Sequence, residues 1–142
     1  MKDFPDIYII TDSKYGDYKT VVEEFQQLVD CAEDDKECLD RIIVQIYNND
    51  MFDAVESVYH FENYIYTLYQ RGYSNLDELA EFCRNNDIPV VVLPYDWWNN
   101  DVKEILGSNN LRVYLHTIND EKKVMEYFEQ GVDGIYTDGF VP

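Results

Sequence analysis

Basic residues are scarce in this chain. Its 142 residues include 11 Lys and Arg against 29 Asp and Glu, which gives a formal net charge of −18. An acidic surface repels nucleic-acid phosphates and anionic membranes, so we expect no nucleic-acid partner. A solvated acidic surface is the simplest interpretation of the charge. The apolar share of 46% and the aromatic share of 15% are too high for a disordered acidic chain.

Patterns typical of a membrane span or a leader are also scarce in this sequence. No stretch approaches the roughly 18 consecutive apolar residues that a spanning helix requires. The N-terminus, MKDFPDIYIITD, has no basic region followed by a long apolar run, so no signal peptide is visible. The cellular compartment therefore stays open.

Cysteine is rare as well. Cys31, Cys38 and Cys83 form no CxxC pair, so we expect no zinc site. Cys31 and Cys38 flank an acidic loop and would be able to bridge it in an oxidising compartment, but free thiols are the expectation. No glycine-rich GxGxxG or GxxxxGK[ST] motif follows any apolar run, which removes the usual support for a nucleotide-binding sheet.

Short apolar runs alternate with amphipathic segments along the whole chain. The runs predict strands at 6–11, 41–47, 63–69, 88–94, 111–117 and 132–138. Helical spacing of apolar residues predicts helices at 17–31, 50–59, 75–86, 99–107 and 119–130. Ser74 or Asn75 is the expected cap of the third helix, and Gly131 the expected end of the last.

The strands are apolar throughout, which is typical of a parallel sheet buried on both faces. We therefore predict one α/β domain over residues 1–142, built from parallel βα units. Periodicity alone leaves two architectures open, an open flavodoxin-like sheet with a small-molecule site and part of a barrel. A complete (β/α)8 barrel needs about 200 to 250 residues, more than this chain has.

The most specific pattern lies at the end of the chain. One strand ends in His116 and is followed by Thr117 and Asn119, and the next begins with Gly-Val-Asp-Gly-Ile at 131–135 and ends in Thr137 and Asp138. This pattern resembles the last two βα units of the glycerophosphodiester phosphodiesterase family. The resemblance implies an incomplete (β/α)8 TIM barrel, equivalent to strands 3–8 of that family.

A second match follows the first predicted strand. Asp12 and Lys14 resemble the Glu-x-Lys at the end of the family's third strand, with Asp in place of Glu. Residues two apart in a strand point to the same side. The resemblance implies that Asp12 is a ligand of a divalent metal, Ca or Mg, and that Lys14 is a catalytic residue holding a phosphate oxygen. An exposed ion pair at a strand end is the alternative.

The same resemblance suggests substrate-binding residues further along. Gln45 and Tyr47 follow the pattern of the family's fourth strand and would face the mouth of the barrel, and Tyr69 would line the pocket from the fifth. For these residues core packing is the alternative. Trp97 either walls the pocket or packs in the core or a lid.

The two histidines have different expectations. His116 stands where the family often has a tryptophan that contacts substrate, and we expect it to bind substrate, with a satisfied buried histidine as the alternative. His60 falls in a helix-to-strand loop, on the side opposite the expected active site, so we expect no catalytic role for it.

The family's two acid/base histidines and its Glu-x-Asp metal ligands come from the first two units, which have no counterpart here. The resemblance therefore implies a small phosphodiester as substrate and a metal only in a completed barrel. It also implies that the isolated chain is close to inactive. A non-catalytic binding or assembly module derived from such a barrel is the alternative. An incomplete barrel leaves apolar strands open at both edges, so we predict self-association or an N-terminal complementing segment.

Overall fold

The computed structural model describes residues 6–13, 16–33, 35–69 and 75–139. The strands in these ranges are β1 Ile9–Ile10, β2 Ile42–Ile46, β3 Asn63–Thr67, β4 Val90–Pro94, β5 Arg112–His116 and β6 Gly134–Ile135. The helices are α1 Tyr18–Ala32, α2 Lys36–Leu39, α3 Asn49–Glu56, α4 Leu76–Asn85, α5 Asn100–Ser108 and α6 Glu121–Glu129, with a 3₁₀ turn η1 at Tyr95–Trp97. Every predicted strand and helix is present, and the short α2 is an addition.

The strands are ordered as they follow one another in the sequence, β1-β2-β3-β4-β5-β6. The pairs β1–β2, β4–β5 and β5–β6 are parallel. A flavodoxin-like sheet has the order 2-1-3-4-5, so that alternative is wrong. Sequential parallel strands with intervening helices are the arrangement of a (β/α)8 barrel. The predicted class, α/β with parallel repeats of an incomplete TIM barrel, is confirmed.

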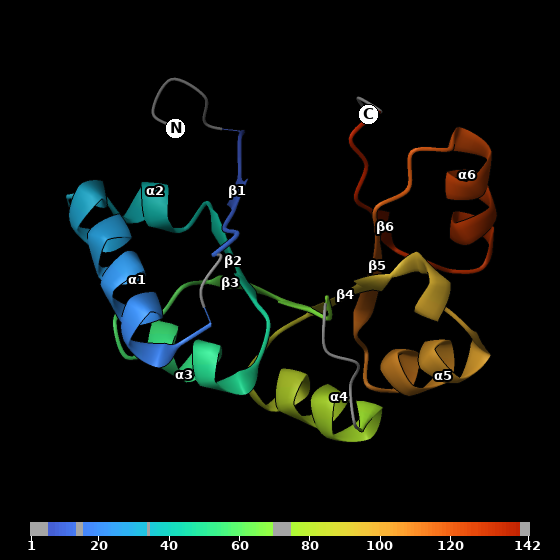
Figure 1. Ribbon diagram of the computed structural model, residues 1–142, viewed down its shortest axis with the longest axis horizontal. Helices are drawn as coiled ribbons and strands as arrows, with labels where there is room; N and C mark the ends of the chain where they lie inside the picture. Colours follow the sequence, from blue (N-terminus) through green and yellow to red (C-terminus); the bar gives the residue numbers. More distant parts are fainter. Residues whose placement is uncertain (1–5, 14–15, 34, 70–74, 140–142) are drawn as a thin grey trace. The chain divides into compact units, whose positions relative to one another are not determined.

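The chain divides into two compact units, residues 1–65 and 66–142. In the first, α1 lies against α3, and β1 runs beside β2 (Figure 1). In the second, β5 lies between β4 and β6, and α4 contacts α5 (Figure 1). The expectation of one domain over residues 1–142 stays a prediction. No helix among the described residues combines the length and hydropathy that crossing a membrane demands.

Burial is deepest in the strands that have a neighbour on each side. Val91, Val92 and Leu93 of β4 are at most 1% exposed, and so are Val44 and Ile46 of β2. Side chains of consecutive residues point to opposite faces, so both faces of these strands are covered. The prediction of strands buried on both faces is confirmed for β2 and β4.

Strands β1, β5 and β6 depart from that prediction, and both residues of β6 are only half-buried. The segment predicted as a buried strand at 6–11 forms only the two-residue β1, and Ile9 and Ile10 are 46% and 43% exposed. The reason is position: β1 stands at the end of the strand order and pairs only with β2 among the described residues. In β5, Val113 and Leu115 are buried while Arg112 is exposed, so burial alternates along the strand. The expectation of an open apolar edge is confirmed for β1.

Each described α-helix begins behind an Asp or Asn whose side-chain oxygen accepts a hydrogen bond from a backbone N–H of the first turn. These capping residues are Asp17, Asp35, Asn48, Asn75, Asn99 and Asp120. Such caps stabilise a helix because they satisfy N–H groups that have no partner within it. The prediction of Asn75 is confirmed, and Ser74 lies outside the described residues. At the other end of α6, Gly131 adopts a φ of 94°, so its prediction as a helix end is confirmed.

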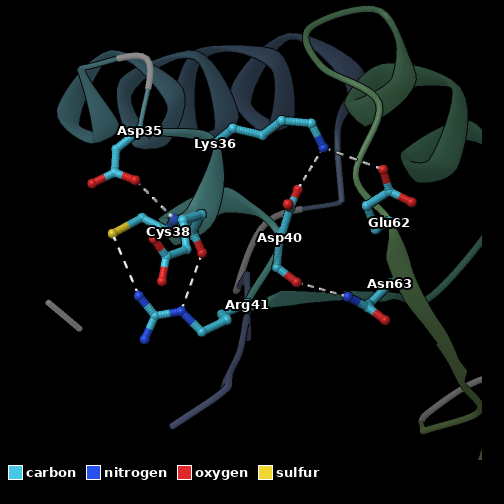
Figure 2. Close-up of polar contacts among 8 residues, drawn as sticks. Asp35, Lys36, Cys38, Asp40, Arg41, Glu62 and Asn63 are labelled. Carbon is cyan, nitrogen blue, oxygen red and sulfur yellow. Dashed lines mark hydrogen bonds and ion pairs between the residues drawn. The ribbon is translucent and has the colours of Figure 1, made fainter. Parts of the chain in front are cut away.

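A polar network joins the short helix α2 to the starts of β2 and β3. Figure 2 shows the Lys36 side chain reaching Asp40 Oδ1 at 2.9 Å and Glu62 Oε1 at 3.5 Å. The Asn63 side-chain amide donates to the carbonyl of Asp40 at 2.9 Å. The hydrogen bond and charge of Asp40 raise the pKa of Lys36. These contacts tie the loop before β2 to the loop before β3, which helps to align the two strands.

Arg41, a buried residue, contacts α2 in the same region. It is 7% exposed, its Nε donates to the carbonyl of Glu37 at 3.1 Å, and its guanidinium lies 3.9 Å from Cys38 Sγ (Figure 2). A buried charge must be hydrogen-bonded to be tolerated, and the end of α2 supplies an acceptor. The helix α2 was missed in the sequence because four residues are too few to show a helical period. All three thiols, including Cys31 and Cys83, are free, as predicted.

The start of β6 depends on a glycine. Asp133 and Val113 exchange hydrogen bonds, from Asp133 N to the Val113 carbonyl at 2.9 Å and from Val113 N to Asp133 Oδ2 at 2.8 Å. This seats Gly134 opposite Tyr114 in the parallel register. A Cβ at Gly134 would lie 2.7 Å from the Tyr114 ring, which is closer than any side-chain contact permits.

We predict that Gly134→Ala lowers the free energy of unfolding by about 1 to 3 kcal/mol, because the ring and strand must separate. Gly107→Ala is the matched control: no atom lies within 4 Å of its added Cβ in α5. It should raise stability by up to about 1 kcal/mol through helix propensity. Urea unfolding measures both. Equal effects of the two changes would contradict the role assigned to the Tyr114 contact.

Burial also makes stability depend on alkaline pH. Cys83 in α4 is fully buried, and burial raises its pKa from 9.0 to about 12. The folded state therefore keeps a proton that the unfolded state loses, so this contribution is complete below about pH 9 and declines towards about pH 12. We predict that Cys83→Ala reduces the loss of stability per pH unit over that range by up to about 1.4 kcal/mol.

Urea unfolding at several alkaline pH values measures this slope. Cys31→Ala, which removes an exposed thiol, is the control. Tyr66 and Tyr136, whose pKa values burial raises to about 12, leave a residual slope of the same sign in both variants. Identical slopes in the Cys83→Ala variant and the unmodified chain would rule out the buried thiol as the source.

Candidate functional site

Polar and aromatic side chains follow the C-terminal ends of the parallel strands. Asp12 comes two residues after β1, Tyr69 two residues after β3, and Trp97 three residues after β4, while Gln45 and His116 lie within the last two residues of β2 and β5. In βα barrels this end of the strands carries the catalytic residues. Lys14, the predicted phosphate-holding residue, lies outside the described residues.

In the first unit, hydrogen bonds link two of these side chains, Gln45 and Asp12, through Tyr47. The Gln45 Nε2 donates to the Tyr47 hydroxyl at 2.5 Å, and the Tyr47 hydroxyl donates to Asp12 Oδ1 at 2.6 Å. Gln45 is 7% exposed, whereas Asp12 is exposed. A buried amide thus orients a phenol, which in turn orients a carboxylate at the surface. Bonds to a charged acceptor are among the stronger hydrogen bonds, so Asp12 has a preferred direction.

The segment that carries Asp12 is held by further bonds to β2 and α1. Thr11 N donates to the carbonyl of Ile43 and Thr11 Oγ1 accepts from Gln45 N, both at 3.0 Å. One residue beyond Asp12, the Ser13 hydroxyl donates to Glu24 Oε2 at 2.5 Å. Although β1 is short, these bonds hold the backbone on both sides of Asp12.

In the second unit, Tyr69 and His116 form an aromatic pair. Their ring centroids are 5.6 Å apart at an interplanar angle of 44°. His116 Nε2 lies 3.4 Å from the carbonyl oxygen of Leu68, so the end of β3 also holds the imidazole. His116 is half-buried and Tyr69 is 58% exposed. The pair offers an imidazole and a phenol to a ligand at these strand ends.

Asn119 joins the loop after β5 to the end of β6. Its Oδ1 accepts from the Thr137 hydroxyl at 3.0 Å and from Asp138 N at 2.8 Å, and its Nδ2 donates to Asp138 Oδ2 at 3.3 Å. The Thr137 hydroxyl also accepts from Gly139 N at 3.2 Å. Sequence reasoning matched these residues to a family pattern but assigned them no role. The geometry shows that they position the loop that follows His116.

Two further aromatic residues lie near these strand ends. Trp97 is half-buried in η1, and its carbonyl accepts from the Asn99 side chain at 3.1 Å. The hydroxyl of Tyr136, which follows β6, is buried without a hydrogen-bond partner in the described structure. Its burial was not foreseen, because a phenol in an apolar run gives no sign of where its hydroxyl points.

His60 precedes β3 rather than following it. Its Nδ1 contacts Glu56 Oε2 at 2.9 Å, and the same carboxylate accepts from the Tyr64 hydroxyl at 2.5 Å. Burial and this carboxylate raise the pKa of Tyr64. The histidine thus lies at the N-terminal end of its strand, and its lack of a catalytic role stays a prediction.

The described residues do not by themselves form a site for a metal ion. Calcium and magnesium prefer several oxygen ligands. Asp12 is one carboxylate, and one of its oxygens already accepts the Tyr47 hydroxyl. Among residues 6–13, 16–33, 35–69 and 75–139, no group of three or more Asp, Glu, His or Cys side chains is placed to hold a metal. A metal at Asp12 would need ligands from elsewhere.

Fold and strand-end residues together define a partial parallel βα barrel with polar groups at the ends of its strands. Two solved structures share this fold. A glycerophosphodiester phosphodiesterase from Parabacteroides distasonis aligns with a TM-score of 0.71 and 14% identity, over 96% of this chain and 56% of that chain. A phosphodiesterase from Oleispira antarctica, solved with the product sn-glycerol-3-phosphate, aligns with a TM-score of 0.71 and 12% identity, over 96% and 53%.

The chain therefore has a glycerophosphodiester phosphodiesterase-like fold, and it spans about half the length of these structural relatives. No protein-family model matches the sequence, and no curated protein sequence does. The similarity lies in the backbone arrangement, because so little of the sequence is shared.

The Asn119 bonds lead to a prediction about local opening. Asn119→Ala removes three hydrogen bonds from the loop between β5 and the end of β6, so the Asp138 amide should exchange its hydrogen about tenfold faster. Hydrogen exchange measured by NMR tests this. Asn109→Ala, which removes an amide bonded to the Ile105 carbonyl in α5, should leave the Asp138 amide unchanged. Unchanged exchange in Asn119→Ala would show that the loop is held by other contacts.

Proposed function

We propose that this chain is the C-terminal part of a phosphoric diester hydrolase that acts on a small glycerophosphodiester, and that the isolated chain is inactive. The observation that supports it best is the fold shared with two phosphodiesterases over 96% of the chain. The Oleispira antarctica relative was solved with sn-glycerol-3-phosphate, the kind of product that hydrolysis of such a diester releases. The same substrate class is therefore the natural proposal for this chain.

Each strand-end residue has a part in this proposal. Tyr69 and His116 contact the substrate, since a phenol and an imidazole both donate hydrogen bonds to phosphate or hydroxyl oxygens. Trp97 is a further substrate-binding residue of the second unit, and Gln45 is a substrate-binding residue of the first. For Gln45, the bond to Tyr47 suggests an indirect contribution, in which it orients the phenol next to Asp12. Lys14 holds a phosphate oxygen.

A divalent cation, Ca or Mg, belongs to the proposal only in a completed barrel. Asp12 would supply one carboxylate ligand there, and the remaining ligands would come from the complementing part. Such a cation would supply positive charge to the phosphate. The described residues contain no group of side chains that would hold such a cation. The missing positive charge at the phosphate is the physical reason for the expected inactivity. The complement is provided by self-association or by an N-terminal segment.

A second candidate is a non-catalytic binding or assembly module of the same fold. Both candidates are compatible with the described residues, in which no group of three or more metal-ligating side chains is placed to hold a metal. A module kept for assembly has no need of the Tyr69–His116 pair as a ligand site. The two candidates therefore differ in whether this pair binds a glycerophosphate.

The two histidines of the chain allow an internally controlled test. We predict that sn-glycerol-3-phosphate shifts the NMR signals of the His116 ring saturably and leaves those of His60 unchanged, because only His116 lies at the strand ends. Tyr69→Ala should weaken the apparent affinity about tenfold by removing a hydrogen-bonding partner. No shift at His116, or equal shifts at both rings, would contradict the hydrolase proposal and favour the module.

Hydrolysis of glycerophosphocholine, with and without Ca or Mg, tests the second half of the proposal. Neither the isolated chain nor its Asp12→Asn variant should turn over the substrate. Metal-dependent turnover that Asp12→Asn abolishes would contradict the expected inactivity and show that the chain completes a site by itself or through self-association.

A further inference from the structure

Asp138 follows β6 and carries an exposed carboxylate that hydrogen bonds hold in place. Its backbone N–H donates to Asn119 Oδ1 at 2.8 Å, and Asn119 Nδ2 donates to its Oδ2 at 3.3 Å. Asp138 takes part in none of the ion pairs that the described residues form. The carboxylate therefore has a preferred direction but no cationic partner within the described part of the chain, so it is able to bind a cation from outside.

The backbone places Asp138 close to His116. Tyr136 N donates to the carbonyl of Leu115 at 2.8 Å, and Ile118 N donates to the carbonyl of Tyr136 at 2.9 Å. His116 therefore lies beside Tyr136, and Asp138 is two residues further along the same segment. Two residues of extended chain rise about 7 Å. A ligand that contacts the His116 imidazole at one end is thus able to reach the Asp138 carboxylate with the other.

The loops around Asp138 are acidic. The described segments that follow β4, β5 and β6 are 95–99, 117–120 and 136–139, and their charged residues are Asp96, Asp120 and Asp138. None of these three segments contains Lys or Arg. Together with the formal net charge of −18, the three carboxylates give this end of the second unit a negative potential, which attracts cations and repels anions.

The two basic residues nearest to these loops in the sequence already have partners. Lys122 pairs with Glu126 at 3.9 Å, and the Lys123 ammonium lies 5.9 Å from the centroid of the Tyr95 ring. Both ammonium groups are thus engaged by residues of α6 or η1, whereas the Asp138 carboxylate has no such pairing.

We propose that Asp138 determines substrate specificity by binding the ammonium group of a glycerophosphodiester whose alcohol part is cationic, as in glycerophosphocholine. This inference rests on the proposed function and narrows its substrate class. The phosphate lies at His116, and two carbon atoms separate its ester oxygen from the ammonium nitrogen. This spacer and the carboxylate side chain together bridge the distance between His116 and Asp138. Asn119 is a positioning residue, since it contacts Asp138 rather than the substrate.

The gain from this contact is modest because Asp138 is exposed. Ion pairs between exposed groups contribute little, which corresponds to about three- to fivefold in affinity. A neutral alcohol gains no such attraction, and an alcohol part with its own negative charge is repelled by the same potential. The carboxylate therefore discriminates between diesters more than it tightens their binding.

The test compares glycerophosphocholine with glycerophosphoglycerol, whose alcohol part is neutral, by NMR titration of the full chain. The His116 ring signals report the phosphate, and the Asp138 backbone amide reports the alcohol part. Glycerophosphocholine should bind about three- to fivefold more tightly and should shift the Asp138 amide by the larger amount. The difference in affinity should shrink as the salt concentration rises, because salt screens exposed charges.

Two variants assign the preference to one carboxylate. Asp138→Asn removes the charge but keeps a side-chain oxygen that accepts from the Asn119 amide, and it should bind the two diesters equally. Asp87→Asn is the matched control, because Asp87 is also exposed and precedes β4, at the opposite end of the strands of the same unit. Its φ of 54° is one that Asn adopts readily. Asp87→Asn should keep the full preference for glycerophosphocholine.

Equal affinity of the unmodified chain for the two diesters would overturn the proposal. A preference that survives Asp138→Asn, or one that Asp87→Asn abolishes to the same extent, would overturn it as well. Equal affinities together with a His116 shift by sn-glycerol-3-phosphate would remove only this specificity and leave the hydrolase proposal standing. No His116 shift by any of the three compounds would contradict both proposals.

Discussion

Parallel strand pairing is the constraint on which the rest of this structure depends. A parallel strand reaches its next neighbour only through a crossover, so helices alternate with strands along the chain. Strands that have neighbours on both sides are covered on both faces, and β4 is accordingly almost free of solvent contact. Polar side chains of the strands are therefore found mainly at the strand ends, where burial is incomplete.

Polar side chains at the strand ends are arranged in two ways. Asp12 is exposed but oriented, because the buried Gln45 holds Tyr47 and Tyr47 holds the carboxylate. Tyr69 and His116 are paired through their rings and fixed by the carbonyl of Leu68. Both arrangements place a polar group at the surface while the groups that orient it remain in or next to the core. Such support from residues behind the site is what precise ligand binding requires.

Parallel strand pairing also explains which strand has an unpaired edge and exposed apolar side chains in the described structure. A strand at the end of the order has one bonded edge and one open edge, and β1 exposes its isoleucines for this reason. The start of β2 shows the contrasting case, where Lys36, Asp40 and Asn63 satisfy one another and bind two loops together (Figure 2). Polar networks close the region before β2 and β3, whereas β1 pairs only with β2 among the described residues.

Sequence patterns were sufficient for the alternation of elements and for the helix starts. Apolar runs and helical periods are local properties, and Asn75 and Gly131 act on their own helices, so their roles were predictable from their neighbours in the chain. The pattern at 113–138 led to the fold class through its resemblance to a known family, although Asp133 makes its hydrogen bonds to Val113, 20 residues earlier in the chain.

Other features depend on residues far apart in the sequence. The four-residue helix α2 is stabilised by the network that includes Glu62 and Asn63, and no helical period announces it. The hydrogen bonds from Gln45 through Tyr47 to Asp12 join residues more than thirty positions apart in the sequence. Asn119 and Asp138, which are also hydrogen-bonded, are separated in the sequence by helix α6. The sequence by itself thus determined the βα alternation, the cap at Asn75 and the acidic net charge. Tertiary structure alone decided which strand is left at the edge and which side chains orient one another, because hydrogen bonds and burial depend on neighbours in space.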